Sequence, residues 1–428
     1  MSSRRDFLRT ASGSVAAAVA TFHPDGLARI AEAAAAVAGR APEDVARDED
    51  FWREVQSAFT LDRTMINLNN GGACPSPRVV LEAQKRYLDI SNQAPVYFMW
   101  RVLEPGIEPV RSQLAAMLSC DREEVAVTRN ASESLQICQL GIDLAPGDEV
   151  VTTTHDYPRM MDTWEQRVRR DGIKLVKVPF PVPPTQADLV SAVERAITPR
   201  TKVVHVCHIT NLTGHIFPVR EICDLARQRG IRTIVDGAHA FAHFPFAIGD
   251  LGCDYYGVSL HKWLLAPIGT GLLWVRRALI KDTWPLQPAN EKLTGDIRKY
   301  EEIGTHPAAT HNAIAEAIAF HQGIGVERKL ARLRYLRDRW AGRVRTLPNV
   351  RLNTDLDPRV SAGIANVRLT NADSGKLAEH LWDRHRIVVT PIKHPDFEGI
   401  RVTPNVYTTL GEIDTFAGAL AHVAERGM

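Results

Sequence analysis

The sequence predicts an α/β protein with a large, mostly parallel sheet domain and a smaller C-terminal α/β domain. From residue 77 onward, short apolar runs alternate with longer helical segments, which is typical of a parallel sheet covered on both faces. Motif residues fall at the ends of these runs, where such sheets bind ligands. After Thr310, long helices precede short strands. We therefore expect a large domain over 67–309 and a small domain over 310–428.

The elements follow from the length and period of each apolar segment. In the large domain, strands are expected at 124–128, 149–153, 174–178, 202–209, 232–235, 255–259 and 269–275. Its helices are expected at 79–90, 106–118, 132–142, 160–170, 186–196 and 219–229. In the small domain, helices at 312–322, 326–345 and 412–425 accompany strands at 363–369, 387–390 and 400–403.

The N-terminus resembles a twin-arginine export signal. Arg4-Arg5 precede an alanine-rich region that is too short and too weakly apolar to span a membrane. Small-residue cleavage sites occur at 36–38 and, less favourably, at 18–20; the alternative is a chance Arg-Arg pair before an amphipathic helix. We expect a signal over 1–38 and a linker and arm over 39–66, with the first ordered helix near 51–59. The expected location is periplasmic or secreted, with no membrane anchor after cleavage.

The net charge and the cysteine positions indicate which kinds of partner and metal site to expect. The 428 residues carry a net charge of +2, which gives no reason to expect a nucleic-acid partner. The six cysteines show no metal-ligand spacing, so we expect no metal site. An exported protein could form disulfides, but a chain that folds before export is under less pressure to do so, and we expect free thiols.

A lysine motif follows the strand expected at 255–259. That strand ends in Ser259 and is followed by His261 and Lys262, while the preceding strand runs into Asp236. This order suits pyridoxal 5′-phosphate (PLP): the lysine amine forms an imine with the aldehyde, the aspartate pairs with the ring nitrogen, and Ser259 and His261 donate to the phosphate. A surface lysine after a strand is the alternative. The sequence predicts Lys262 and Asp236 as catalytic residues.

The stretches 236–239 (Asp-Gly-Ala-His) and 259–262 (Ser-Leu-His-Lys) resemble the active-site signature of class V aminotransferases, which are fold-type I PLP enzymes. The resemblance covers about residue 67 to the C-terminus. It implies that Lys262 moves a proton as general base and acid, and that Asp236 keeps the cofactor ring protonated. His239 stands where desulfurases usually carry glutamine. It resembles the isopenicillin N epimerase branch, and it implies a donor to the cofactor's phenolic oxygen.

A phosphate site is expected where Asn130, Ala131 and Ser132 open a helix after a strand. Free N–H groups and the helix dipole favour an anion there. The segment resembles the family's Arg-Gly-Thr-Thr-Glu motif, with Ala131 replacing a threonine, so that only its backbone would serve. A plain helix N-cap is the alternative.

The resemblance implies further contacts to the ring. Tyr157, seven residues before Trp164, matches an aromatic residue that stacks on the cofactor, and His155 is its rival. Asn211 matches an asparagine beside the phenolic oxygen and the substrate carboxylate; the alternative is a turn-forming residue.

Substrate and partner contacts are also implied. Arg401 matches a C-terminal arginine that binds the substrate carboxylate, for which its forked side chain is suited. Asn70 lies in a loop that the epimerase-like branch places beside the substrate. Thr305 matches a threonine that reaches the phosphate of the neighbouring subunit's cofactor, which implies a homodimer with shared active sites.

The function expected is that of a PLP-dependent enzyme acting at the amino-bearing carbon of an amino acid or a peptide-like metabolite, of aminotransferase or epimerase type. Desulfurases need a cysteine shortly before the carboxylate-binding arginine, and 387–401 contains none. The alternatives are a PLP-dependent lyase or oxidative decarboxylase that tailors a secreted metabolite, and a non-catalytic PLP-binding protein. A Rossmann-type dehydrogenase is excluded because no Gly-x-Gly-x-x-Gly follows a strand.

Overall fold

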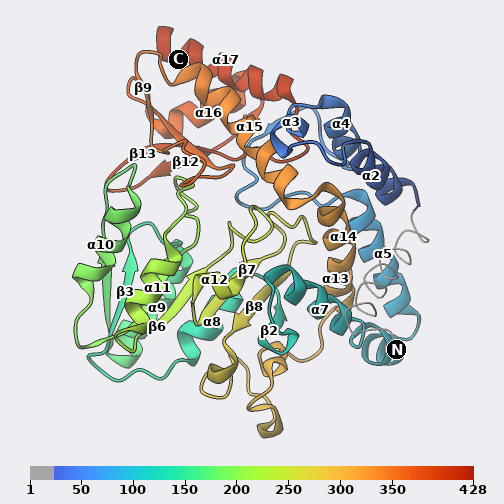
Figure 1. Cartoon of the computed structure of the whole chain (residues 1–428), viewed down its shortest axis with the longest axis vertical. Helices are drawn as coiled ribbons and strands as arrows, with labels where there is room; N and C mark the ends of the chain where they lie inside the picture. The colour runs from blue at the N-terminus through green and yellow to red at the C-terminus, as the bar shows by residue number, and fades with distance from the viewer. Residues whose placement is uncertain (1–23) are drawn as a thin grey trace.

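The computed structural model describes residues 24–428. A seven-stranded sheet flanked by helices forms the large domain, and a four-stranded antiparallel sheet with helices forms the small one (Figure 1). The expected fold class is confirmed. The twin-arginine motif and the cleavage site expected at 18–20 lie outside the described residues. None of the helices in residues 24–428 combines the length and the apolar content needed to cross a membrane.

The large sheet has the strand order β2-β8-β7-β6-β5-β3-β4, in which β8 runs antiparallel to both its neighbours and the other pairs are parallel. Strands β2, β3, β7 and β8 are buried along their whole length, as expected for the interior of a sheet that is covered on both faces. The bounds are β2 Val125–Thr128, β3 Glu149–Thr153, β4 Lys174–Val178, β5 Thr201–Cys207, β6 Arg232–Asp236, β7 Tyr255–Ser259 and β8 Gly271–Val275.

The helices of the large domain begin and end within a few residues of the expected positions. They are α5 Arg78–Gln93, α7 Ile107–Leu118, α8 Ala131–Gly141, α9 Pro158–Asp171, α10 Gln186–Ala196 and α11 Val219–Arg227. Strands β2, β5, β6 and β7 run in the same direction, so their carboxyl ends lie at one edge of the sheet. Helix α8 follows β2 directly, and its first residues therefore lie at the same edge.

The small domain contains two elements that the sequence analysis missed, the three-residue strand β9 and the helix α16. The strand expected at 387–390 is divided, because β11 pairs with β1 (Ile66–Asn67) and β12 pairs with β13. Its helices are α15 Val326–Val344, α16 Ser374–His385 and α17 Leu410–Arg426. Its strands are β9 Val350–Leu352, β10 Ala365–Leu369, β11 Ile387–Val388, β12 Thr390–Lys393 and β13 Glu398–Val402.

The domain boundary expected at residue 310 is wrong. Helices α13 (Ala308–Asn312) and α14 (Ile314–Ile324) contact α5 and α7, and Ile318 and Phe320 belong to the core of the large domain. The boundary between the two hydrophobic cores lies within α15, because Leu333 packs into the core of the large domain and Leu336 packs into the core of the small domain.

Half of the segment expected as a polar linker at 39–50 is helical, and the helix expected near 51–59 is present at Glu49–Ser57. Helices α2 (Pro24–Ala36), α3 (Pro42–Val45) and α4 (Glu49–Ser57) lie against α14 and α15 (Figure 1). Val45 and Trp52 are fully buried, and the indole Nε1 of Trp52 donates to the Val45 carbonyl at 2.8 Å. Ile30 of α2 is buried where Gly323 of α14 leaves room for it. Residues 24–59 are therefore part of the folded body.

Removal of residues 1–38 is expected to leave a less stable protein than removal of residues 1–23. The longer deletion strips Ile30 and Val37 from the core, and each buried aliphatic side chain contributes about 1.5–3 kcal/mol. Thermal unfolding of the two truncated proteins should differ by roughly 5 °C. Equal midpoints would show that α2 adds nothing to the fold.

Candidate active site

A cavity of about 680 Å³ opens at the carboxyl ends of β5, β6 and β7, and β12 and β13 of the small domain form its opposite wall. It brings together most of the residues predicted from the sequence. These are Asn130, Ala131, Ser132, Tyr157, Asn211, Asp236, His239, Ser259, His261, Lys262 and Arg401.

Lys262 follows the carboxyl end of β7, and its Nζ lies 3.0 Å from the Nε2 of His239. The Nε1–H of Trp263 donates to the Nδ1 of His239 at 3.4 Å. Because an indole N–H can only donate, the neutral ring of His239 carries its proton on Nε2. Burial keeps the pKa of His239 well below its ordinary value, so the ring is neutral at neutral pH. The tautomer with its proton on Nε2 is the form that can donate to a phenolic oxygen.

Residues that the sequence analysis missed hold the lysine segment in place. The fully buried indole of Trp263 stacks on His243, with ring centroids 3.7 Å apart. Lys329 of α15 donates its Nζ proton to the carbonyl of Trp263. The Nδ1 of His243 lies 2.8 Å from the carbonyl of His239, and its Nε2 accepts from the N–H of Gly363 in the small domain. No short motif marks these contacts, because they join segments far apart in the chain.

Asp236 ends β6 and is buried. Its Oδ1 accepts the N–H of Ala238 at 2.9 Å. Burial raises the pKa of the carboxyl to about 6, and the Ala238 N–H and the Lys262 charge act in the opposite direction. A cationic group placed beside Asp236 would stabilise its ionised form, as a protonated pyridine nitrogen would.

An anion site lies where α8 begins next to the end of β7. The Oγ of Ser259 accepts the N–H of Ala131 at 2.9 Å, so its own proton is left to donate into the cavity. Within residues 24–428, no protein acceptor takes the N–H or the hydroxyl of Ser132. Asn130 caps the helix by accepting from the N–H of Glu133, and this cap leaves the start of α8 open to an anion, so the two interpretations of the segment are compatible.

His261 lies beside this site in a specific tautomer. Its Nδ1 is 3.1 Å from the carbonyl of Thr270 and must donate to it. Burial and the Lys262 charge lower the pKa of His261. The predicted donation to a phosphate therefore requires a second proton, on Nε2, which the phosphate's own negative charge would favour.

The substrate end of the cavity is built around Arg401 of β13. Its Nη1 donates to the carbonyl of Asn211 at 3.1 Å, and its Nη2 donates to the Oδ1 of Asn69 at 2.8 Å. The Nε of Arg401 and the Oδ1 of Asn211 are buried without a partner in the described part of the chain. Unsatisfied buried polar atoms are rare, so this end of the cavity is suited to a polar ligand. The interpretation of Arg401 as an exposed strand residue is wrong.

The assignment of Asn70 to the substrate is wrong. Its side chain is fully buried outside the cavity, donates to the carbonyl of Thr403 at 2.9 Å and accepts from the hydroxyl of Tyr407. The neighbouring Asn69 holds Arg401 instead, and it also accepts from the hydroxyl of Thr390 at 2.6 Å. Successive side chains of an extended segment point to opposite sides, so a shift of one residue exchanges their roles.

Tyr157, rather than His155, lines the cavity. Its ring is 40% exposed, and it precedes α9 at the mouth. The ring of His155 is buried between Phe180 and His394, away from the residues around Lys262. Of the two candidates, Tyr157 is therefore the one placed to contact a ligand in this cavity.

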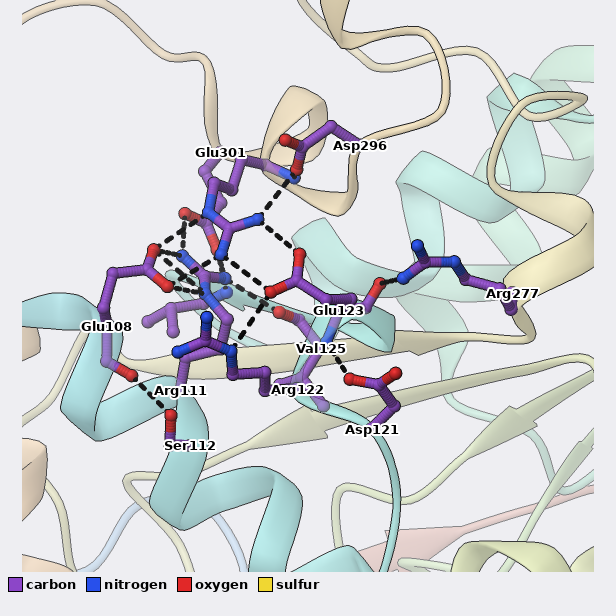
Figure 2. Close-up of polar contacts among 12 residues, drawn as sticks. Glu108, Arg111, Ser112, Asp121, Arg122, Glu123, Val125, Arg277, Asp296 and Glu301 are labelled. Carbon is purple, nitrogen blue, oxygen red and sulfur yellow. Dashed lines mark hydrogen bonds and ion pairs between the residues drawn. The ribbon is translucent and has the colours of Figure 1, made fainter.

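Thr305 lies outside this cavity, on an exposed loop that lines a separate cavity of about 430 Å³ beside Arg129. A charge network anchors the segment leading to it (Figure 2). The buried Arg111 donates to Glu301 and to the carbonyl of Val125. Arg298 donates to Glu108 at 2.7 Å and to Glu123 at 2.7 Å. Within its own chain Thr305 does not reach the Lys262 cavity, so its role toward a partner stays a prediction.

Reloading of the apoprotein with PLP is expected to accelerate with pH and to level off about one pH unit above the pKa of the Lys262 amine. Burial lowers the pKa of the Lys262 amine to about 8, while Asp236 opposes the shift. Below that pH the amine is increasingly protonated and cannot attack an aldehyde. The rate should rise about 5-fold from pH 7 to 8 and about 2-fold from pH 8 to 9. N-acetyl-lysine, with an ordinary pKa, should keep accelerating about 10-fold per pH unit. Parallel profiles would contradict the lowered pKa.

Comparisons with known proteins agree with this site. The family model for aminotransferase class-V matches residues 66–393. Isopenicillin N epimerase of Streptomyces clavuligerus is 30% identical over 86% of this chain and 97% of its own length. Among solved structures, the apo cysteine desulfurase from Thermococcus onnurineus NA1 superposes with a TM-score of 0.77 at 23% identity, covering 87% of this chain and 98% of that one. A C-DES variant with glycine covalently linked to its PLP cofactor gives a TM-score of 0.75 at 22% identity, covering 85% and 99%.

The residues present fit PLP. Ser259 and the start of α8 would hold the phosphate, Asp236 would pair with the ring nitrogen and Lys262 would bind the aldehyde. The protonated ring nitrogen would balance the charge of Asp236, and the phosphate would balance the positive end of the α8 dipole. Gly271 belongs to the same cradle, because a Cβ there would lie 2.6 Å from the backbone of Asn130. The family match and this donor set together show that the chain belongs to the aminotransferase class V family of PLP-dependent enzymes.

Proposed function

We propose that the enzyme acts at the amino-bearing carbon of an amino acid or a peptide-like metabolite, by transamination or epimerisation. The observation that carries this proposal is that the Lys262 amine and the Arg401 guanidinium line the same cavity. One α-amino acid can therefore present its amine to the first and its carboxylate to the second. The unpartnered Nε of Arg401 and Oδ1 of Asn211 offer further contacts to the same substrate.

The residues divide the chemistry between them. Bound PLP supplies an electron sink for the charge that develops at the substrate carbon. Lys262 takes the proton from that carbon and returns it, because its lowered pKa lets the amine serve as base and acid near neutral pH. His239 keeps an N–H directed at Lys262 and the cofactor site, and Arg401 orients the carboxylate.

Persulfide chemistry is not part of this proposal. The 387–401 segment has no cysteine, and Cys207 is the cysteine that lines the cavity. Its Sγ lies 3.0 Å from the Oδ1 of Asp156, and burial together with that carboxylate raises its pKa well above the ordinary value. Cys207 therefore remains a thiol, whereas the nucleophile in persulfide formation must be a thiolate.

The reaction type can be read from products formed in deuterated water. The holoenzyme is incubated with a panel of L-amino acids and short peptides, with and without an α-keto acid, and products are analysed by chiral chromatography and mass spectrometry. Epimerisation gives D-isomers labelled at Cα without an acceptor. Transamination gives a keto acid only with an acceptor, and a lyase releases the side-chain leaving group. Absence of both turnover and Cα exchange would support a non-catalytic PLP-binding protein.

We also propose that the functional unit is a homodimer in which Thr305 donates to the phosphate in the partner's site. Its exposed position outside its own Lys262 cavity supports this role. Loss of one hydrogen bond to a charged group, about 1.5–3 kcal/mol, should weaken PLP retention in Thr305→Ala by roughly 10- to 100-fold. Mixed dimers of Thr305→Ala and Lys262→Ala should recover activity, since one site then has both groups. No recovery in verified mixed dimers would assign Thr305 to its own subunit or to no cofactor.

Export through the twin-arginine route is a further proposal, supported by Arg4-Arg5 ahead of a weakly apolar segment. Because α2 belongs to the folded body, the proposal places cleavage upstream of residue 24 rather than at 36–38. Changing both arginines to lysine should retain the folded protein in the cytoplasm. Sequencing of the exported protein's N-terminus tests the cleavage position, and normal export of the double variant would refute the route.

A further inference from the structure

Two histidines and an aspartate form a cluster outside the PLP cavity. His155 follows β3 of the large domain, whereas His394 and Asp396 lie in the hairpin between β12 and β13 of the small domain. One possible ligand atom from each residue lies within 4.8 Å of the other two. The cluster therefore bridges the two domains.

The side chain of His155 has no partner for either ring nitrogen in the described part of the chain, although it is fully buried. A neutral imidazole carries one N–H donor and one lone pair, so both are left unsatisfied. Its ring lies 4.0 Å from that of Phe180 and 4.5 Å from that of His394, between centroids.

The ring of His394 is oriented as in many metal sites. Its Nε2 lies 3.0 Å from the carbonyl of Thr154 and must donate to it, which leaves the lone pair on Nδ1. Nδ1 lies 3.6 Å from the Oδ2 of Asp396 and accepts the N–H of that residue at 3.2 Å. A ring N–H held by a backbone carbonyl fixes the tautomer and orients the other nitrogen toward a cation.

We propose that His155, His394 and Asp396 bind one divalent transition-metal ion, with Zn²⁺ the best chemical match. Two imidazoles and a carboxylate are a common zinc donor set, and a water molecule can supply the fourth ligand. The ion would satisfy the orphaned His155 and would replace the N–H of Asp396 at Nδ1. His394 and Asp396 line a cavity of about 920 Å³, which gives the ion a route of entry.

Such an ion would tie the hairpin to the large domain. Strand β12, which leads into the hairpin, contributes Thr390 and Ile392 to the PLP cavity, and Tyr157 lies two residues after His155. The site would therefore stiffen the substrate side of the cavity without contacting it. The sequence expectation of no metal site rested on cysteine spacing alone, and it could not anticipate ligands from two domains.

Calorimetric titration of the holoenzyme with ZnCl₂, after removal of bound metal by a chelator, tests the proposal. We expect one Zn²⁺ per chain, with affinity reduced roughly 10- to 100-fold in His394→Ala and in Asp396→Asn. His385→Ala, which removes an exposed histidine of the same domain, should keep the wild-type affinity. Zn²⁺ should also raise the thermal midpoint of the wild type and of His385→Ala, and should not raise it in the two site variants.

Asp396→Asn keeps the size of an exposed hairpin residue, so its circular dichroism should match the wild type and misfolding would not explain a loss of binding. Co²⁺ titration gives a second measurement, because absorption bands of a four-coordinate site should appear in the wild type and be lost in both variants. Zn²⁺ affinity unchanged in both site variants, or no Zn²⁺ binding by the wild type, would overturn the assignment.

Discussion

Lys262→Ala is expected to lose the covalently held cofactor and at least about 10³-fold in turnover. The substitution removes both the amine that captures the PLP aldehyde and the group that moves the substrate proton; proton transfer by a positioned side chain alone contributes about 10²–10⁴-fold. The purified variant should lack the absorbance band of lysine-bound PLP. Borohydride treatment and peptide mapping should find PLP on Lys262 in the wild type and on no lysine in the variant.

Controls separate the chemical role of Lys262 from a structural one. Lys281→Ala removes an exposed lysine outside the cavity and should behave as the wild type. A small primary amine added to Lys262→Ala should restore part of the proton transfer, which a folding defect would not allow. Persistence of the lysine-bound band in Lys262→Ala would show that another residue holds the cofactor.

Asp236→Asn should retain PLP but lose about 10²–10³-fold in turnover, the scale seen when one electrostatic contact to developing charge is removed. Asparagine has nearly the same size and its amide oxygen can still accept the N–H of Ala238, so the local fold should persist. Without the carboxylate, the ring nitrogen loses the countercharge that keeps it protonated. Asp236→Glu, which restores the charge on a longer side chain, should be affected less.

Asp254→Asn provides a matched control for this prediction. Asp254 precedes β7 at the end of the strand opposite Ser259, where it accepts from Arg276 at 2.9 Å. Its substitution should lower thermal stability with little change in turnover. The electron-sink role of Asp236 would be refuted by an Asp236→Asn enzyme with wild-type activity, measured as kcat at saturating PLP.

The sequence by itself determined the elements and motifs whose signals are local. Strands β3, β4 and β7 and helix α10 have the expected bounds, because each coincides with one apolar run or one amphipathic segment between polar turns. Lys262, Asp236 and Ser259 could be predicted from the order of one short motif after two strands, and the structure brings all three into one cavity, because the carboxyl ends of neighbouring parallel strands lie side by side.

Tertiary structure decided the features that depend on contacts between distant segments. Asn69 rather than Asn70 holds Arg401, because Thr403 and Tyr407 engage Asn70 from the far end of the chain. Helices α2 and α3 stand where a signal peptide and a linker were expected, because α14 and α15 cover apolar side chains that are too widely spaced to form a run. His155 and His394 meet only when the two domains pack together. Local patterns determine which backbone conformation a segment adopts. Which side chains face the core, the cavity or the other domain depends on the free energy of burying them against partners hundreds of positions away.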